Sequence, residues 1–206
     1  MGGSAKAANR EAAQARMDEM ARQQDIRVGT SKIDNIFAKN FGEDFFKGRR
    51  EAYQNYATPQ LEDQYGKAGQ ELTFSLARNG LLDSSARAQK EGELQKLYDL
   101  NRQGITDQAI SQESRSRNAV EDARSGLVTM LNATGDAQGA ANSALARSAA
   151  LSQPQAFSPL TNLFGDFTGA LATQANLERS AALSGGIVKP AFNTGLFNAG
   201  KPVVNR

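Results

Sequence analysis

The stretch of residues 58–131 constrains the fold more than any other, because its pattern predicts one long helical hairpin. Thr58 and Pro59 favour a helix start, since threonine can accept a hydrogen bond at the N-cap and proline needs no N–H in the first turn. Apolar residues then recur at the three- and four-residue spacing of one helix face. They are Leu61, Tyr65, Ala68, Leu72 and Leu76.

A turn is predicted between the two arms of this hairpin. Asn79 and Gly80 favour a helix end, because both adopt the left-handed backbone conformation readily. Asp83 and Ser84 can cap a second helix, and no proline then follows until Pro154. The second arm is therefore expected to be one long helix.

The two arms differ in length. At 1.5 Å per residue, residues 84–131 would form a helix of about 70 Å and residues 59–79 one of about 30 Å. More than half of the second arm therefore lacks a partner from the first. We expect that half to pack on another segment, to pack on another subunit, or to stand in solvent. Gly104 is the expected place for a kink or break, with Thr106 capping a restarted helix.

The apolar stripe of the second arm lapses over the wholly polar residues 111–118. Gln112 and Ser116 occupy positions where the helical spacing calls for apolar side chains. One hypothesis is that this stretch faces the lumen of an assembly. Its candidate lumen-facing residues are Gln112, Arg115, Ser116 and Arg117. The basic pairs Arg49/Arg50 and Arg115/Arg117 are also candidates for contact with a nucleic-acid backbone, although a solvated surface is the default interpretation.

The N-terminal quarter of the chain is also predicted to be helical. Residues 4–24 are rich in good helix formers, but their apolar face is mostly alanine, which buries little area. This helix therefore either needs a partner surface or is a frayed terminal arm. The β-branched residues around Gly29 are expected to break it before a short helix that carries Ile33, Ile36 and Phe37.

Residues 37–56 contain four phenylalanines and two tyrosines, the densest aromatic cluster in the chain. Burial preferences favour a small local core under the hairpin. The alternative function is an anchor for a partner protein.

Small residues dominate residues 135–151, which predicts either close helix packing or a flexible linker. Pro154 and Pro159 then mark a boundary. An apolar stripe at helical spacing follows, and its residues are Leu160, Leu163, Phe164, Phe167 and Leu171. We expect this stripe to contact a membrane or another subunit, or to be the buried face of an ordinary amphipathic helix.

The last 22 residues carry two five-residue units that each end in an Asn-x-Gly turn signal. Residues 185–206 are therefore expected to form an extended docking tail, with Phe192 and Phe197 as its candidate contacts. The expected segments are an N-terminal helical arm with the aromatic cluster (1–57), the long hairpin (58–152), the amphipathic apolar helix (153–184) and this tail.

Composition supports a mainly α fold: an elongated helical hairpin or bundle with a long helix and an irregular or β-like C-terminal tail. Only 39% of the 206 residues are hydrophobic and 7% are aromatic, with no tryptophan. Large core-forming side chains are thus scarce, so stability is expected to depend partly on neighbouring molecules.

The chain lacks most of the side chains that commonly carry out catalysis. Cysteine and histidine are both absent, which removes thiolate and imidazole ligands and the usual nucleophile–base pairs. Acidic pairs such as Glu62/Asp63 are sequence neighbours and point in different directions on a helix. We therefore expect no catalytic, cofactor or metal site and no enzymatic activity. Neither a signal-peptide core in residues 1–25 nor an apolar run of membrane-spanning length is present.

One resemblance covers the middle third of the chain. The segments TPQLEDQYGKA (58–68) and SLARNGLLDSSA (75–86) contain a P-x-L-x-x-Q helix that leads through L-A-R-x-G-L-x-x-S into a long helix rich in Ala, Gln, Glu and Arg. This pattern resembles the internal virion (DNA-ejection) proteins of short-tailed bacteriophages, of the smaller outer-membrane-channel type.

The resemblance implies a structural protein that is stored inside the capsid near the portal, leaves through the tail and assembles in the host envelope into a conduit for DNA. The implied partners are further copies in a ring or tube, other virion proteins (portal, tail and further ejection proteins), DNA bound non-specifically, and the host outer membrane. A static tail or portal-adaptor protein is the alternative, and a cell-wall lytic enzyme is a third hypothesis.

Overall fold

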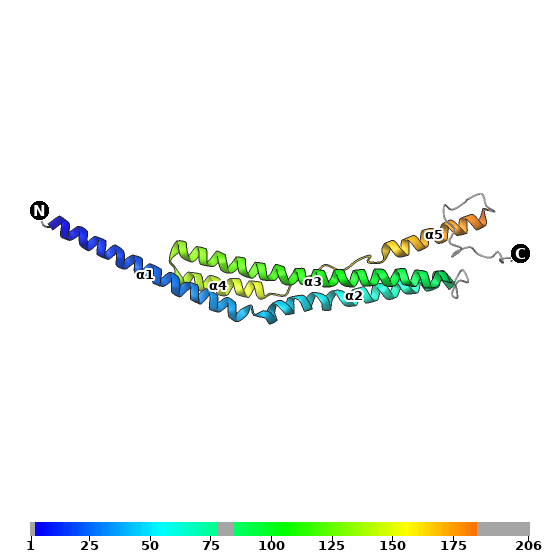
Figure 1. The fold of residues 1–206 in the computed structure, drawn as a ribbon, viewed down its shortest axis with the longest axis horizontal. Helices are drawn as coiled ribbons and strands as arrows, with labels where there is room; N and C mark the ends of the chain where they lie inside the picture. Colours follow the sequence, from blue (N-terminus) through cyan, green and yellow to red (C-terminus); the bar gives the residue numbers. More distant parts are fainter. Residues whose placement is uncertain (1–2, 78–84, 185–206) are drawn as a thin grey trace. The chain divides into compact units, whose positions relative to one another are not determined.

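The computed structural model describes residues 3–77 and 85–184. Within these ranges the chain forms five helices and no strand (Figure 1). They are α1 (Gly3–Asn40), α2 (Glu43–Ala77), α3 (Ser85–Thr134), α4 (Ala137–Ser152) and α5 (Gly165–Leu183). The expected mainly α class is confirmed for this part of the chain. The predicted turn at 79–84 and the docking tail with Phe192 and Phe197 lie outside the described residues.

The chain divides into two compact units, each built from two separate stretches. Unit 1 combines Met1–Glu51 with Ala109–Ala156, and unit 2 combines Ala52–Gln108 with Phe157–Arg206. Helices α2 and α3 contribute residues to both units. These units do not coincide with the four consecutive segments expected from the sequence.

The predicted helix start at Thr58 is wrong, because α2 begins at Glu43 and Pro59 lies inside it. An interior proline costs a helix about 3 kcal/mol, since it lacks an N–H and crowds the preceding turn. Here Ala57 and Leu61, before and after the proline, are both fully buried. Burial of this face on both sides of Pro59 therefore outweighs the local signal for a helix start.

The predicted break around Gly29 is also wrong, because α1 continues through it. A Cβ atom at position 29 would lie 2.7 Å from Leu131 Cδ2 and 3.1 Å from the Ala137 Cα. A side chain here would force Leu131 to move and crowd the Ala137 backbone, so glycine lets α1 approach its neighbours closely. Gly29 is thus a packing residue and not a helix breaker.

Helix α3 runs without a break through Gly104, where a kink was expected. Its 50 residues correspond to about 75 Å. The Thr106 hydroxyl donates to the Arg102 carbonyl, one turn earlier in the same helix, and does not cap a restarted helix. Leu94 before Gly104 and Ile105 and Ala109 after it are all buried. Tertiary burial again overrides the glycine.

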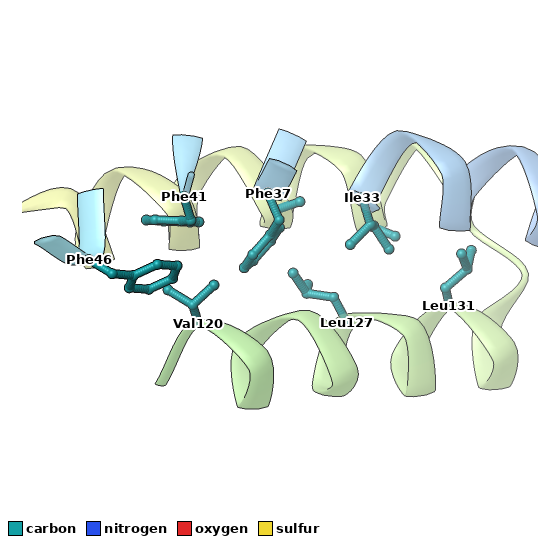
Figure 2. Packing of buried hydrophobic residues seen from close by; sticks show 9 residues of the cluster. Ile33, Phe37, Phe41, Phe46, Val120, Leu127 and Leu131 are labelled. Atoms are coloured by element: carbon teal, nitrogen blue, oxygen red, sulfur yellow. The ribbon is translucent and has the colours of Figure 1, made fainter. Parts of the chain in front are cut away.

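The core of unit 1 joins α1 and the start of α2 to the C-terminal half of α3 and to α4. Figure 2 shows Ile33 and Phe37 pointing toward Leu127 on α3, and Phe46 lying beside Val120. The buried cluster consists of Ile33, Phe37, Phe41, Phe46, Val120, Leu127, Leu131, Ala140 and Ala144. The favoured interpretation of the aromatic cluster as a local core is confirmed for its three buried phenylalanines. The C-terminal half of α3 therefore packs on another segment of its own chain, the first of the three alternatives.

The small-residue tract forms helix α4, so the close-packing alternative is confirmed. Gly135 ends α3 with a φ of 71°, and its N–H donates to the Leu131 carbonyl at 2.7 Å. The Asp136 carboxylate then caps α4 by accepting from the N–H groups of Gln138 and Gly139. Helix α4 lies beside α1 in unit 1 (Figure 1) and buries Ala140, Ala141, Ala144 and Ser148.

In unit 2, α2 and α3 form the predicted hairpin and α5 packs with them. Leu61, Ala68, Leu72 and Leu76 of the predicted stripe are buried, as is Leu94 on α3. The Tyr65 hydroxyl donates to Gln95 at 2.8 Å, and the Tyr98 hydroxyl donates to Glu62 at 2.7 Å. The rings of Tyr65 and Tyr98 also pack with their centroids 4.6 Å apart.

Candidate assembly surfaces

The polar stretch of α3 forms an ion-pair network inside unit 1. Arg117 donates to both carboxylate oxygens of Glu43, at 3.0 and 2.6 Å, and to Glu113 at 2.9 Å. Its guanidinium carbon lies 4.3 Å from the centre of the Phe46 ring. Arg50 donates to the other oxygen of Glu113 at 3.0 Å. The network therefore ties the first turns of α2 to α3.

Hydrogen bonding in this network shifts the pKa values of its members. The hydrogen bonds from Arg117 hold the pKa of Glu43 below its usual value, and the two carboxylates raise the pKa of Arg117. Arg124 makes a similar link, donating to Asp34 of α1 at 2.8 Å and to Glu121 at 2.7 Å. The hydrogen bond from Arg124 lowers the pKa of Glu121. Both arginines and the carboxylates of Glu43 and Glu121 therefore stay charged across the physiological pH range.

The four candidate lumen-facing residues do not form one exposed face. Ser116 is only 6% exposed, and its hydroxyl donates to the Gln112 carbonyl at 2.9 Å. It continues the buried stripe between Ala109 and Val120, so a small serine stands where an apolar residue was expected. Arg117 is engaged in the network above, Gln112 is half-buried and Arg115 is exposed. Whether these residues line a lumen in an assembly stays a prediction.

Arg49 caps the C-terminal end of α4. Its guanidinium donates to the carbonyl oxygens of Leu151 and Gln153, both at 2.6 Å, and lies 4.8 Å from the centre of the Phe45 ring. The side chain is buried, and this burial lowers the pKa of Arg49. Arg49 and Arg50, proposed above as possible nucleic-acid contacts, are therefore both held by partners in unit 1. Nothing in the sequence around Arg49 and Arg50 indicated that Arg49 caps a helix.

The predicted apolar stripe is mostly buried within unit 2. Helix α5 begins at Gly165, so Leu160 and Leu163 precede it and are half-buried. Phe164, Phe167 and Leu171 are 4%, 8% and 7% exposed. The ring of Phe164 lies 6.0 Å from that of Tyr65. Within this chain, the stripe is therefore mainly the buried face of an amphipathic segment. Its contact with a membrane or another subunit stays a prediction.

Two glutamines of α2 hold the segment that leads into α5. The Leu160 N–H donates to Gln60 at 2.9 Å, and the Leu163 N–H donates to Gln64 at 2.9 Å. The Gln64 amide in turn donates to the Leu160 carbonyl at 2.6 Å. Gln60 and Gln64 are four residues apart and thus share one helix face. Their role was missed, although Gln64 is the glutamine of the P-x-L-x-x-Q pattern.

Aromatic packing fixes the start of the same segment. The ring of Phe157 lies 5.2 Å from that of Tyr53, nearly edge-on, and 5.4 Å from that of Tyr56. The two tyrosines of the aromatic cluster therefore belong to unit 2, whereas its buried phenylalanines belong to unit 1. Sequence spacing alone gave no sign of this division.

The N-terminal part of α1 is a long helical stretch that no other described segment covers. Every residue from 7 to 25 is exposed, including Met17 at 66% and Met20 at 69%. The Arg22 guanidinium donates to the Asn132 carbonyl at 2.8 Å, where this arm meets the end of α3. The arm is helical, so it fits the expectation of a helix that needs a partner surface better than that of a frayed end.

Neither a metal site nor a membrane span is found among the described residues. No group of three or more acidic side chains there is placed to hold a metal ion, and no helix is long and apolar enough to cross a membrane. Comparisons of the chain with protein-family models, curated proteins and solved structures gave no match. A functional proposal therefore rests on the resemblance at residues 58–86 and on the surfaces described above.

Proposed function

We propose that this chain is a DNA-ejection (internal virion) protein of a short-tailed phage, which oligomerises into part of a channel for genome delivery through the host envelope. The observation that carries the proposal is the P-x-L-x-x-Q and L-A-R-x-G-L-x-x-S pattern, which leads from α2 into the 50-residue helix α3. The virion, and after infection the host envelope, are its proposed locations.

The uncovered arm of α1 supports an assembly role. Residues 7–25 correspond to about 29 Å of helix whose side chains are exposed. Most helical stability in proteins comes from packing, and these residues lack that contribution within their own chain. Neighbouring subunits or other virion proteins, such as the portal and further ejection proteins, would supply the missing surface. Non-specific contact with DNA would follow if such subunits surround a channel.

Membrane contact by the apolar stripe requires a conformational change. Phe164, Phe167 and Leu171 are buried in unit 2, so α5 must leave the α2–α3 hairpin before the stripe can meet lipid. Storage in this form keeps a large apolar patch away from water and so prevents aggregation before delivery. The glutamine contacts of Gln60 and Gln64 are then the polar interactions that must break.

Dye release from vesicles tests this proposal. The vesicles contain phosphatidylethanolamine, phosphatidylglycerol and lipopolysaccharide, and the purified full chain is added under conditions in which it oligomerises. A variant with Gln64→Cys and Leu163→Cys is compared oxidised and reduced, because the Gln64 side chain already accepts a hydrogen bond from the Leu163 N–H and the chain has no other cysteine. We expect release by the wild type and the reduced variant, and none by the oxidised variant. No release by the oligomeric wild type would overturn the channel.

A static tail or portal-adaptor protein is the second candidate. The burial of Phe164, Phe167 and Leu171 favours it, since a permanent structural subunit has no need to expose them. This candidate predicts a stable oligomer that never releases dye and in which α5 stays packed. Equal dye release by the oxidised and reduced cysteine variants would contradict both the static protein and the required release of α5.

A further inference from the structure

The exposed arm of α1 carries opposite charges on two different faces. With 100° between successive helical residues, Arg10, Arg16 and Arg27 fall on the same side as Met17, Met20 and Val28. Arg10, Met17 and Val28 lie opposite to the side that places Ile33 and Phe37 in the core of unit 1, and the other three lie between. All six side chains are exposed, and no acidic residue falls among them. We call these six residues the basic face.

Acidic side chains form a separate line along the same arm. Glu11, Asp18 and Asp25 follow one another at intervals of seven residues, which places them nearly above one another on a helix. They are exposed, and together we call them the acidic line. Neither these three carboxylates nor Arg10, Arg16 and Arg27 take part in an ion pair within residues 3–77 and 85–184. By contrast, Arg50, Arg117 and Arg124 are paired within unit 1.

The two sets of charges also match in height along the helix. Arg10 stands one residue from Glu11, Arg16 two residues from Asp18, and Arg27 two residues from Asp25. These offsets correspond to about 1.5–3 Å along the axis. Two parallel arms placed side by side without a shift would therefore bring three arginines level with three carboxylates. Met17, Met20 and Val28 would be covered in the same step.

We propose that the basic face of one chain packs on the acidic line of a second copy, with the two α1 arms parallel and in register. The contact is heterologous, because it joins two different surfaces. In a pair of chains, one copy keeps its acidic line free and the other keeps its basic face free. Repetition of such a contact closes into a ring when its rotation allows. The inference deepens the proposed function, on whose expectation of a homo-oligomer it rests, by naming the surface through which the copies join.

Two charge-reversed variants test this contact. One variant carries Arg10→Glu, Arg16→Glu and Arg27→Glu, and the other carries Glu11→Arg, Asp18→Arg and Asp25→Arg. In each variant alone, the two surfaces carry charges of the same sign and repel. We therefore expect the protein concentration at which half of the chains are assembled, measured by sedimentation velocity, to be at least tenfold higher than for the wild type. Mixing the two restores complementary faces and should restore assembly. Raised salt should weaken the wild-type assembly, because the charges are exposed.

A matched control carries the same charge change outside the arm, as Lys67→Glu, Lys96→Glu and Arg102→Glu on exposed positions of α2 and α3. It should assemble as the wild type does. Helical content by circular dichroism should be alike in all three variants. Assembly of either arm variant at the wild-type concentration, or failure of the mixture to assemble, would overturn the proposed contact.

Cysteine crosslinking gives an independent readout of direction and register. A chain with Arg16→Cys and Asp18→Cys should form a ladder of multimers on mild oxidation, since each copy offers one thiol to each neighbour. Either single variant should stay uncrosslinked. A product that stops at dimers, or crosslinking by a single variant, would overturn the parallel heterologous arrangement. Vesicle binding or DNA binding that depends on the basic face without self-association would overturn it as well, while dye release tests the channel separately.

Discussion

Units 1 and 2 use the same two long helices but retain their additional helices by different means. In unit 1, α1 and α4 pack through buried phenylalanines and small residues, reinforced by arginines that reach across to other helices. In unit 2, α5 and the segment that leads into it are held by three buried apolar side chains and by the side chains of Gln60 and Gln64. If α5 is released as the proposed function requires, we expect unit 1 to stay packed while α5 leaves the α2–α3 hairpin.

Truncation of the unit 1 core should have the largest effect. Leu127 is fully buried, so Leu127→Ala removes apolar contacts and leaves a cavity. We expect the free energy of unfolding in urea to fall by about 2–5 kcal/mol. Leu145→Ala on the exposed side of α4 is the matched control and should change it by less than about 0.5 kcal/mol. Similar losses for both variants would contradict the assignment of this core.

Close packing at Gly29 should have the next largest effect. Gly29→Ala places a Cβ against Leu131 and the Ala137 backbone, so we expect a loss of about 1–3 kcal/mol in urea unfolding. Gly48→Ala meets no atom within 4 Å and should stabilise the protein by about 0.5–1 kcal/mol through helix propensity. If both substitutions stabilise, α1 does not approach α3 and α4 as closely as described.

Gly29 shows why part of the fold could not be predicted. Helical spacing correctly indicated the buried residues Leu61, Leu72 and Leu76, because apolar periodicity reports directly on burial. Gly29, Gly104 and Pro59 were expected to interrupt helices, since local propensity says nothing of the surfaces that later cover a segment. The roles of Gln60 and Gln64 depend on a partner segment about 100 residues away, which no local pattern reveals.

Loss of the glutamine contacts in unit 2 should lower the free energy of unfolding less than the two changes above, but it should clearly affect the hydrogen exchange of α5. Gln64→Ala removes hydrogen bonds to the backbone of Leu160 and Leu163, worth about 1–2 kcal/mol together. We expect faster amide hydrogen exchange across α5 with little change in α1 and α4. Gln70→Ala, an exposed glutamine on the same helix, is the control. Unchanged exchange in α5 would contradict its release through these contacts.

The smallest expected effect is the loss of stability when acid weakens the ion pairs of unit 1. The pKa of Glu43 is lowered by Arg117, so its contribution to stability is complete above the unfolded-state pKa and is lost as the pH falls through the lowered folded-state value. Glu43→Gln should therefore flatten the decline in stability toward acid, measured as urea midpoints across this pH range. Identical pH profiles for the variant and the wild type would show that the pair contributes nothing measurable.

The mass of the native protein, measured in solution and in detergent, tests the central claim most directly, because an ejection-channel subunit must assemble with its own copies. The account predicts a closed homo-oligomer of defined mass, which persists in detergent. A monomer under both conditions, at concentrations up to about a hundred micromolar, would contradict it.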